Sequence, residues 1–201
     1  MTTRFFTNDT VGTTTAQPWP VAGDFNTVSS PDTLNDLLKR LKTVAVVVIK
    51  NGSLLYEKYW DGYSDSSLSN SFSMAKSITS LLIGAAIKEG KIRSVDEAVS
   101  NYLPEFKEGL AAKLIIKDLL TMTSGSNWDE AYVNPFSVTT EGYYGSNLYK
   151  TATGVKINRE PGTHYYYKSG DTELLGLIVE KATGKSLSQY ASEKLWQTTW
   201  R

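Results

Sequence analysis

Ser73 and Lys76 are the residues of this chain whose types and spacing most directly suggest chemistry, in the segment Ser73-Met74-Ala75-Lys76. If the segment starts a helix, both side chains lie on one face of its first turn. Free backbone N–H groups and the helix dipole place partial positive charge there. This field favours an alkoxide on Ser73 and a neutral amine on Lys76, the pair needed to attack an acyl carbon. The alternative is a helix-capping serine followed by a solvated lysine, because an isolated S-x-x-K segment is a weak signal.

Tyr167 is a second candidate, in the segment Tyr165-Tyr166-Tyr167-Lys168-Ser169-Gly170-Asp171. A phenol near a lysine loses its proton more easily and can then pass protons to and from a leaving group. The alternative is a tyrosine-rich loop that packs on the core. Taken by itself, the segment favours that alternative.

A helix from about Met74 to Glu89, ended by Gly90, is expected to position Ser73 and Lys76. Because it is apolar on nearly all sides, we expect it to be buried. A second helix is predicted from Asp171 or Thr172 to Thr183, with a glycine cap, and a last one from about Ser186 to Trp196. Residues 91–160 predict helical fragments, clearest at Lys117–Met122, and no strand.

The first 72 residues predict an arm, a helix and a hairpin. Residues 1–30 read as an extended, poorly packed arm. Ser30 and Pro31 suit the N-cap and first position of a helix, and leucines at helical spacing follow. Val44–Ile49 predicts a buried strand, and Asn51-Gly52 a hairpin turn into Ser53–Trp60.

A sheet of two strands is marginal and leaves an open edge. We therefore expect further strands beyond Arg201, or a partner chain, to complete it. The segment Trp196–Arg201 does not resemble a natural stop, so the sequence predicts a truncated chain.

Composition excludes several classes of function. The 201 residues, 40% of them hydrophobic, suffice for one large domain or two small ones. The net charge of zero argues against a nucleic-acid or anionic-membrane partner. The absence of cysteine and the single histidine argue against thiolate and multi-histidine metal sites, so we expect no metal and no cofactor. No apolar run is long enough to span a bilayer, and no signal peptide is visible, which leaves the compartment open.

Other catalytic patterns fail. His164 could be a triad base, but no G-x-S-x-G segment surrounds any serine, so we expect this histidine to be structural. Thr183-Gly184-Lys185-Ser186 ends like a P-loop, but its first glycine position is Val179, and no G-x-G-x-x-G occurs. Asp129 and Glu130 are adjacent, and we interpret them as solvated.

Several segments taken together resemble the serine β-lactamase and penicillin-binding-protein superfamily, whose S-x-x-K signature is well known. The resemblance covers about residues 40–197 and rests on these segments: Ser73-x-x-Lys76, Leu119–Gly125, Pro161-Gly162, Tyr167-x-Ser169-Gly170-Asp171-Thr172 and Leu175-Gly176. The closest likeness is to the class C-like branch, with its esterases, D-amino-peptidases and 6-aminohexanoate-dimer hydrolases.

This resemblance implies an α+β fold of the β-lactamase/transpeptidase type. A helical lobe of residues 73–171 would be inserted in an α/β lobe of residues 31–72 and 172–201, with an arm of residues 1–30. The antiparallel sheet would be incomplete in this chain, and the site would lie between the lobes with Ser73 at its base.

The resemblance also implies roles for individual residues. Ser73, Lys76 and Tyr167 would be catalytic, and Ser169 would belong to the substrate-binding network. Tyr167-x-Ser169 replaces the commoner Tyr-x-Asn, as in the hydrolase and esterase members. Trp128–Tyr132 resembles a segment of those hydrolases in which a tyrosine faces the substrate, so Tyr132 is a binding candidate, with a core aromatic as the alternative.

The family's third motif, Lys/His-Thr/Ser-Gly on a strand, has no counterpart on a predicted strand here. In the family that strand supplies one of two oxyanion-hole N–H groups, and losing one donor typically costs about 10² to 10³ in rate.

The sequence as a whole predicts a serine hydrolase that cleaves an amide, ester or β-lactam through a Ser73 acyl-enzyme. The alternative is a non-catalytic or truncated penicillin-binding-like protein that acylates without turnover. Several tyrosines suggest a cleft that accepts apolar acyl groups, although they would serve equally well to pack the lobe. They are Tyr132, Tyr143, Tyr144 and Tyr149.

Overall fold

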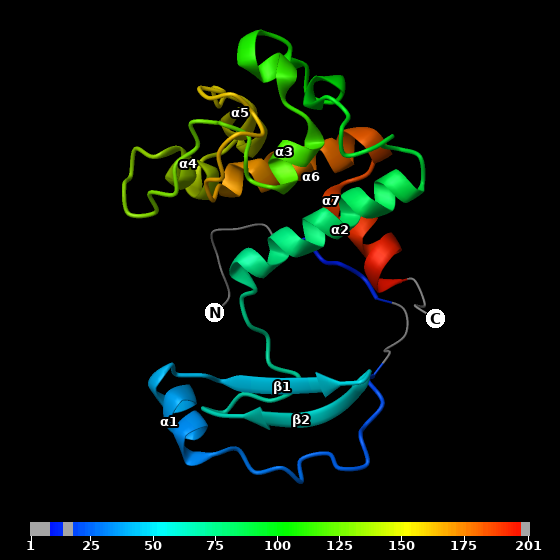
Figure 1. Cartoon of the computed structure of the whole chain (residues 1–201), viewed down its shortest axis with the longest axis vertical. Coiled ribbons are helices and arrows are strands. Elements are labelled where there is room, and N and C mark those ends of the chain that lie inside the picture. Colours follow the sequence, from blue (N-terminus) through cyan, green and yellow to red (C-terminus); the bar gives the residue numbers. More distant parts are fainter. Residues whose placement is uncertain (1–8, 14–17, 198–201) are drawn as a thin grey trace. The chain divides into compact units, whose positions relative to one another are not determined.

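The structure is a computed structural model that describes residues 9–13 and 18–197 (Figure 1). The described residues within 15–71 form one compact unit, and those within 1–14 and 72–201 form a second. Helices dominate the second unit, whereas the first contains an antiparallel hairpin. The predicted α+β class is confirmed. The predicted division into an arm and two lobes stays a prediction.

Helix α2 (Ala75–Lys88) follows a short 3-10 turn, η1 (Phe72–Met74), and ends before Gly90, whose φ is 71°. The predicted helix over 74–89 is therefore confirmed to within a residue. The prediction that it is buried nearly all round is wrong. Its buried residues share one face, and Leu81 on another face is 57% exposed. The reason is that helix α6 (Ser169–Thr183), which packs against α2, covers one side of a helix whose sequence is apolar on several.

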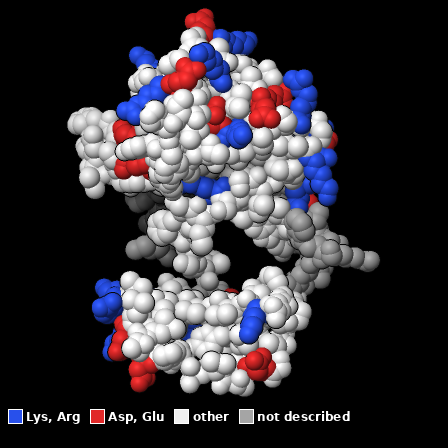
Figure 2. Space-filling model, in the orientation of Figure 1, with Lys and Arg blue, Asp and Glu red and all other residues white. Residues whose placement is uncertain are grey.

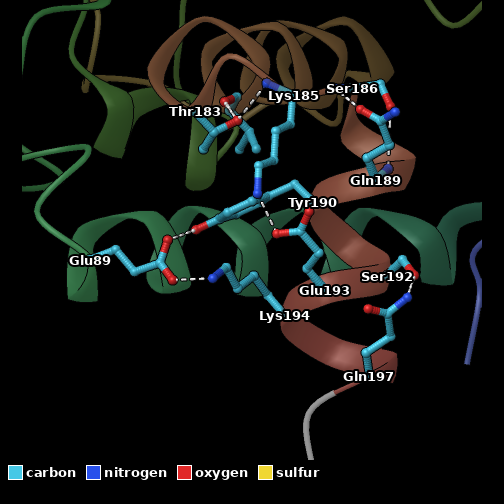
Figure 3. Close-up of polar contacts among 11 residues, drawn as sticks. Glu89, Thr183, Lys185, Ser186, Gln189, Tyr190, Ser192, Glu193, Lys194 and Gln197 are labelled. Atoms are coloured by element: carbon cyan, nitrogen blue, oxygen red, sulfur yellow. Dashed lines mark hydrogen bonds and ion pairs between the residues drawn. The ribbon is translucent and has the colours of Figure 1, made fainter. Parts of the chain in front are cut away.

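Helix α6 begins two or three residues earlier than predicted and ends before Gly184, with φ 71°, as predicted. After it, helix α7 (Leu187–Ala191) continues into a π-helical turn (Ser192–Trp196), so the helix expected from about 186 to 196 is present with a change of pitch. Figure 3 shows how this segment is fastened to the end of α2: Glu89 accepts a hydrogen bond of 3.0 Å from the Tyr190 hydroxyl and pairs with Lys194.

Short helices connect α2 to α6, as the sequence predicts. They are α3 (Ile116–Leu120), α4 (Val138–Tyr144) and α5 (Leu148–Thr153), with 3-10 turns at Val99–Asn101, Pro104–Phe106 and Gly109–Lys113. Within the described residues this region holds isolated bridges and no strand. α3 packs on α6 (Figure 1). The unit encloses an apolar core with these members, among others: Leu82, Ile83, Ile92, Leu103, Phe106, Leu119, Leu174, Ile178 and Tyr190.

In the other unit, helix α1 (Asp32–Arg40) precedes strands β1 (Ala45–Lys50) and β2 (Ser53–Tyr59). Pro31 is the cap of α1 and Ser30 instead donates to Asn35 Oδ1 at 2.7 Å, so the predicted cap is wrong by one residue. The strands pair antiparallel, and the turn residues Asn51 and Gly52 have φ of 50° and 75°. Left-handed conformations at both positions are those of a two-residue hairpin turn, and the predicted hairpin is confirmed.

Strand β1 is more exposed than its sequence predicts. Val47, Val48 and Ile49 are 50%, 40% and 43% exposed, so the expectation of a buried strand is wrong. In the sheet as described, β1 has β2 as its one neighbour, and a continuous apolar run needs cover on both faces to be buried.

The described parts of residues 1–30 lie mostly at the surface, and the predicted extended arm stays a prediction. Val21 bridges to Leu54 on β2, and the carbonyl of Gly12 accepts a hydrogen bond of 2.7 Å from Ser192 Oγ. The rest of the arm, residues 1–8 and 14–17, lies outside the described residues, as do residues 198–201 of the predicted truncated end.

Charge is mixed on the surface. In Figure 2, cationic and anionic side chains are interspersed on the face of each unit that is viewed. None of the helices in the described parts of the chain is long and apolar enough to cross a membrane.

Candidate active site

Ser73, Lys76 and Tyr167 converge on one oxygen atom. Ser73 Oγ accepts a hydrogen bond of 3.2 Å from Lys76 Nζ and one of 2.7 Å from the Tyr167 hydroxyl. Lys76 Nζ also lies 5.2 Å from the centre of the Tyr167 ring. The serine lies in the 3-10 turn η1 and the lysine in the first turn of α2, whereas the tyrosine is 94 positions away from the serine, two residues before α6. The three residues expected to be catalytic are thus brought together.

The electrostatics of this cluster favour proton transfer through the phenol. Hydrogen bonding to Ser73, and then to Lys76, holds the pKa of Tyr167 below the ordinary value of 10.0, although burial acts in the opposite direction. A phenol with a lowered pKa gives up its proton more readily, and its phenolate is a weaker base that needs a stronger acid to protonate it again. The catalytic role of Tyr167 stays a prediction.

The residue before Ser73 is in an uncommon conformation. Phe72 has a φ of 44°, in the left-handed region, which a bulky side chain rarely adopts. Local strain of this kind often occurs beside functional residues. Nothing in the order of residues around Ser73 signals this conformation.

The chain leading to Tyr167 is anchored to the Leu119–Gly125 segment, which covers the end of α3 and the loop after it. The backbone N–H of Tyr166 donates to the Met122 carbonyl at 3.0 Å, and the N–H of Gly162 donates to the Thr123 carbonyl at 2.9 Å. Two segments of the family resemblance that are distant in sequence, Leu119–Gly125 and residues 161–167, are therefore joined by backbone hydrogen bonds.

The start of α6 is closely packed. A Cβ on Gly170 would lie 2.3 Å from the Trp128 ring, so this position of the helix admits glycine alone without a shift of the ring. Asp171, next along the helix, is fully buried and accepts a hydrogen bond of 2.6 Å from Ser124 Oγ. Lys168 is buried too and donates to the Ser126 carbonyl.

Burial raises the pKa of Asp171 from 3.8 to about 6. Because folding raises this pKa, the folded state holds the proton more tightly. The stabilisation from this group is therefore present below about pH 4 and is lost as the pH rises through about 6. Between pH 5 and pH 7.5 the loss is about 1.4 kcal/mol, for roughly one pKa unit. We expect Asp171→Asn, which does not titrate, to gain stability by this amount relative to the parent over that interval.

Urea unfolding of both proteins at the two pH values measures this difference. Asp96→Asn is a matched control, since Asp96 is accessible and lies outside the Asp171 environment. A parent-to-variant difference that stays constant with pH would show that Asp171 titrates normally.

The two predicted substrate-binding residues, Ser169 and Tyr132, lie together and form hydrogen bonds to Glu130 rather than to Ser73. Ser169 is 9% exposed, Tyr132 is 52% exposed, and their hydroxyls are 3.4 Å apart. Both donate to the carboxylate of Glu130. Among the hydrogen bonds of the described residues, none joins Ser169 or Tyr132 to Ser73. Their assignment as binding residues stays a prediction.

The interpretation of Glu130 as a solvated carboxylate is wrong. Its side chain is half-buried and accepts three hydrogen bonds, from the Ser169 backbone, the Ser169 hydroxyl and Tyr132. The contact spans 39 positions of sequence, and no local pattern reports it. Asp129 accepts a bond from the backbone of Ala131 instead.

Of the remaining candidates, Tyr143 contacts the edge of the Tyr132 ring, with ring centres 6.0 Å apart. His164 is exposed and its Nδ1 is 2.9 Å from the hydroxyl of Thr163. Tyr149 packs against the core and bonds to Glu105, whereas Tyr143 and Tyr144 are 53% and 78% exposed. Within the described parts of the chain, no three histidine or carboxylate groups are arranged to hold a metal ion.

A helix-start serine that accepts hydrogen bonds from a lysine and a tyrosine defines a class of protein, the serine enzymes and binding proteins of the S-x-x-K type. Residues 32–199 match the family described as Beta-lactamase, so the chain belongs to the Beta-lactamase family. The predicted resemblance and the β-lactamase-like fold are confirmed.

Three relatives illustrate the range of the family. The chain is 28% identical to Protein flp of Staphylococcus aureus (strain MW2) over 79% of its own length and 34% of that protein. It is 27% identical to the 6-aminohexanoate-dimer hydrolase of Paenarthrobacter ureafaciens over 81% and 45% of the two chains. A solved structure of a candidate 6-aminohexanoate-dimer hydrolase from Bacillus anthracis superposes with a TM-score of 0.73 at 28% identity, over 90% and 52%. The chain therefore spans between a third and about half of the relatives it matches.

Proposed function

We propose that this protein is a serine hydrolase that cleaves an amide or ester through an acyl-enzyme on Ser73. The observation that carries the proposal is the pair of hydrogen bonds that Ser73 Oγ accepts, from Lys76 Nζ at 3.2 Å and from the Tyr167 hydroxyl at 2.7 Å. Both partners can exchange a proton with the serine without moving. An exposed serine outside such a cluster is a weak nucleophile.

The proposed reaction has two halves. Ser73 Oγ attacks the carbonyl carbon while its proton passes to Lys76, in its amine form, acting with Tyr167. The bond to the leaving nitrogen or oxygen then breaks, and that atom takes a proton from Tyr167, or from Lys76 through it. Water, deprotonated by the same pair, attacks the acyl carbon and releases the acid with Ser73 restored. The backbone N–H of Ser73 is the proposed donor to the oxyanion.

The proposed substrates are small amides, esters or β-lactams. Support for an amide comes from the relative named 6-aminohexanoate-dimer hydrolase and from the Tyr167-x-Ser169 segment that resembles such members. We further propose that a C-terminal segment or a partner chain completes the sheet and supplies the second oxyanion donor. The share of the hydrolase that the chain spans, 45%, is consistent with this.

Intact-protein mass spectrometry after incubation with a fluorophosphonate, and separately with an activated ester, tests the proposal. We expect one adduct per chain, located by peptide mapping on the peptide that contains Ser73. A chain that gives no adduct with either reagent would overturn the proposal for this 201-residue protein.

The lifetime of the ester-derived adduct separates hydrolysis from the alternative function. The observation that favours the alternative is that neither strand of the described residues carries a third-motif triplet, since a site with one oxyanion donor would stabilise the second tetrahedral intermediate poorly. An adduct that persists for hours identifies a protein that acylates without turnover. Loss of the adduct with steady release of acid identifies the hydrolase.

A further inference from the structure

Glu130 connects the loop before α4 to the first residue of α6. One carboxylate oxygen, Oε1, accepts the backbone N–H of Ser169, and the other, Oε2, accepts the Ser169 hydroxyl at 3.0 Å and the hydroxyl of Tyr132. The Ser169 N–H belongs to the first turn of a helix and has no partner within it. A carboxylate at that end of a helix is favoured by the dipole as well.

The residue that this contact restrains is close in sequence to the phenol that contacts the reacting oxygen. Ser169 is two positions after Tyr167, whose hydroxyl donates to Ser73 Oγ. The residues on either side of Tyr167 are anchored as well, Tyr166 by its backbone to Met122 and Lys168 by its side chain to the Ser126 carbonyl. Tyr167 itself is 37% exposed, so packing alone does not fix its ring.

From this arrangement we propose that Glu130 is a positioning residue, whose carboxylate holds the start of α6 so that the Tyr167 phenol stays on Ser73 Oγ. This inference rests on the proposed function, because it assigns Glu130 a part in that reaction. Glu130 does not touch Ser73 and takes no proton in the reaction.

A direct role in binding a cationic substrate is less well supported by the same contacts. A carboxylate has about four acceptor positions, and three donors already occupy those of Glu130. About one position is therefore left for a substrate ammonium group. The half-buried position of the side chain also limits its access to a ligand.

A purely electrostatic role makes the opposite prediction for Tyr167. The charge of Glu130 raises the pKa of the Tyr167 phenol slightly, whereas the hydrogen bonds to Ser73 and Lys76 lower it more. If Glu130 acts only as a charge, its removal lowers this pKa. If Glu130 holds the phenol in place, its removal releases the phenol from Ser73 and the pKa rises towards 10.0.

Tyrosine-ring carbon NMR across a pH titration measures this pKa directly, with Tyr167→Phe to assign the signal. We expect Glu130→Ala to raise the pKa of Tyr167. Glu130→Gln keeps the shape and an acceptor for the Ser169 N–H but removes the charge, so we expect the pKa to stay or to fall. Glu108→Gln, an exposed glutamate in the same unit, is the matched control and should leave the titration unchanged.

The rate of Ser73 labelling by the activated ester is the second readout. A displacement of a reacting group by about 1 Å costs on the order of 100-fold in rate. We expect Glu130→Ala to lose about 10-fold to 100-fold, while Glu130→Gln keeps most of the parent rate. Far-ultraviolet circular dichroism checks that both variants are folded. If Glu130→Ala does not fold, Ser169→Ala, which removes one of the three donors, should raise the Tyr167 pKa by a smaller amount.

The two readouts separate failure of this inference from failure of the proposed function. A parent protein that does not label overturns the proposed function, while the tyrosine titration still decides whether Glu130 positions the phenol. A Tyr167 pKa that falls or stays constant in both Glu130→Ala and Ser169→Ala overturns the inference. Equal labelling rates for Glu130→Ala and the parent overturn it as well.

Discussion

Ser73→Ala is expected to abolish covalent labelling while leaving the fold and its stability almost unchanged. The substitution removes the oxygen that attacks the acyl carbon, so Lys76 and Tyr167 no longer have a serine hydroxyl to deprotonate. Ser73 is exposed, so the Lys76 and Tyr167 groups that lose their acceptor are able to bond to water. Exposed substitutions of this kind change stability by about 0.5 kcal/mol or less.

The measurement is intact mass after labelling, together with the midpoint of urea unfolding. Ser77→Ala is the matched control, because Ser77 is an exposed serine in the first turn of α2, four positions after Ser73. It should label at the parent rate. An adduct of undiminished yield in Ser73→Ala would place the nucleophile elsewhere and would contradict the assignment of this site.

Features that depend on neighbouring residues could be predicted from the sequence. The ends of α2 and α6 follow from Gly90 and Gly184, which adopt the left-handed conformation that ends a helix. The hairpin follows from Asn51-Gly52, because both residues tolerate the positive φ that its turn requires. These signals are local, and the structure agrees with them to within about two residues.

Features that depend on what covers an element could not be predicted in this way. Strand β1 and helix α2 are apolar on more faces than the described structure buries, as Val47 and Leu81 show. An apolar sequence indicates that a face is suited to burial, but it does not indicate whether another part of the same chain packs on that face. The family resemblance anticipates an incomplete sheet, whereas periodicity alone predicts simple burial.

The residues of the candidate site also differ in whether the sequence alone predicts their place. Ser73 and Lys76 are three positions apart, so helical geometry places them together. Tyr167 is remote from both, and its place on Ser73 Oγ was predictable only through the set of motifs that resembles a family. Glu130 gave no signal, because its partner Ser169 is 39 positions away and its own segment reads as polar loop. The contact joins a loop to the start of α6, where Trp128 packs on Gly170, and periodicity does not report such packing.

Tyr167→Phe is expected to lower the rate of Ser73 labelling by about 10² to 10⁴, the usual contribution of a positioned proton donor and acceptor. The ring remains and its hydroxyl is lost, so the change removes the 2.7 Å hydrogen bond to Ser73 Oγ with little effect on packing. The parent rate should rise with pH through the lowered pKa of Tyr167, below the ordinary value of 10.0, since the deprotonated phenol is the form that accepts a proton. In the variant this limb of the pH profile should disappear.

Stopped-flow labelling with the activated ester across the pH range measures both effects, with Tyr165→Phe as the matched control because Tyr165 is 68% exposed and lies two positions away. The comparison also decides how the proton leaves Ser73. If Tyr167→Phe keeps the parent rate and the same pH limb, the phenol takes no part, and Lys76, 3.2 Å from Ser73 Oγ, must accept the proton alone. If the limb disappears, the phenol and the lysine act as one proton-transfer unit. The lowered pKa of Tyr167, which depends on contact with both residues, is then part of the catalytic apparatus.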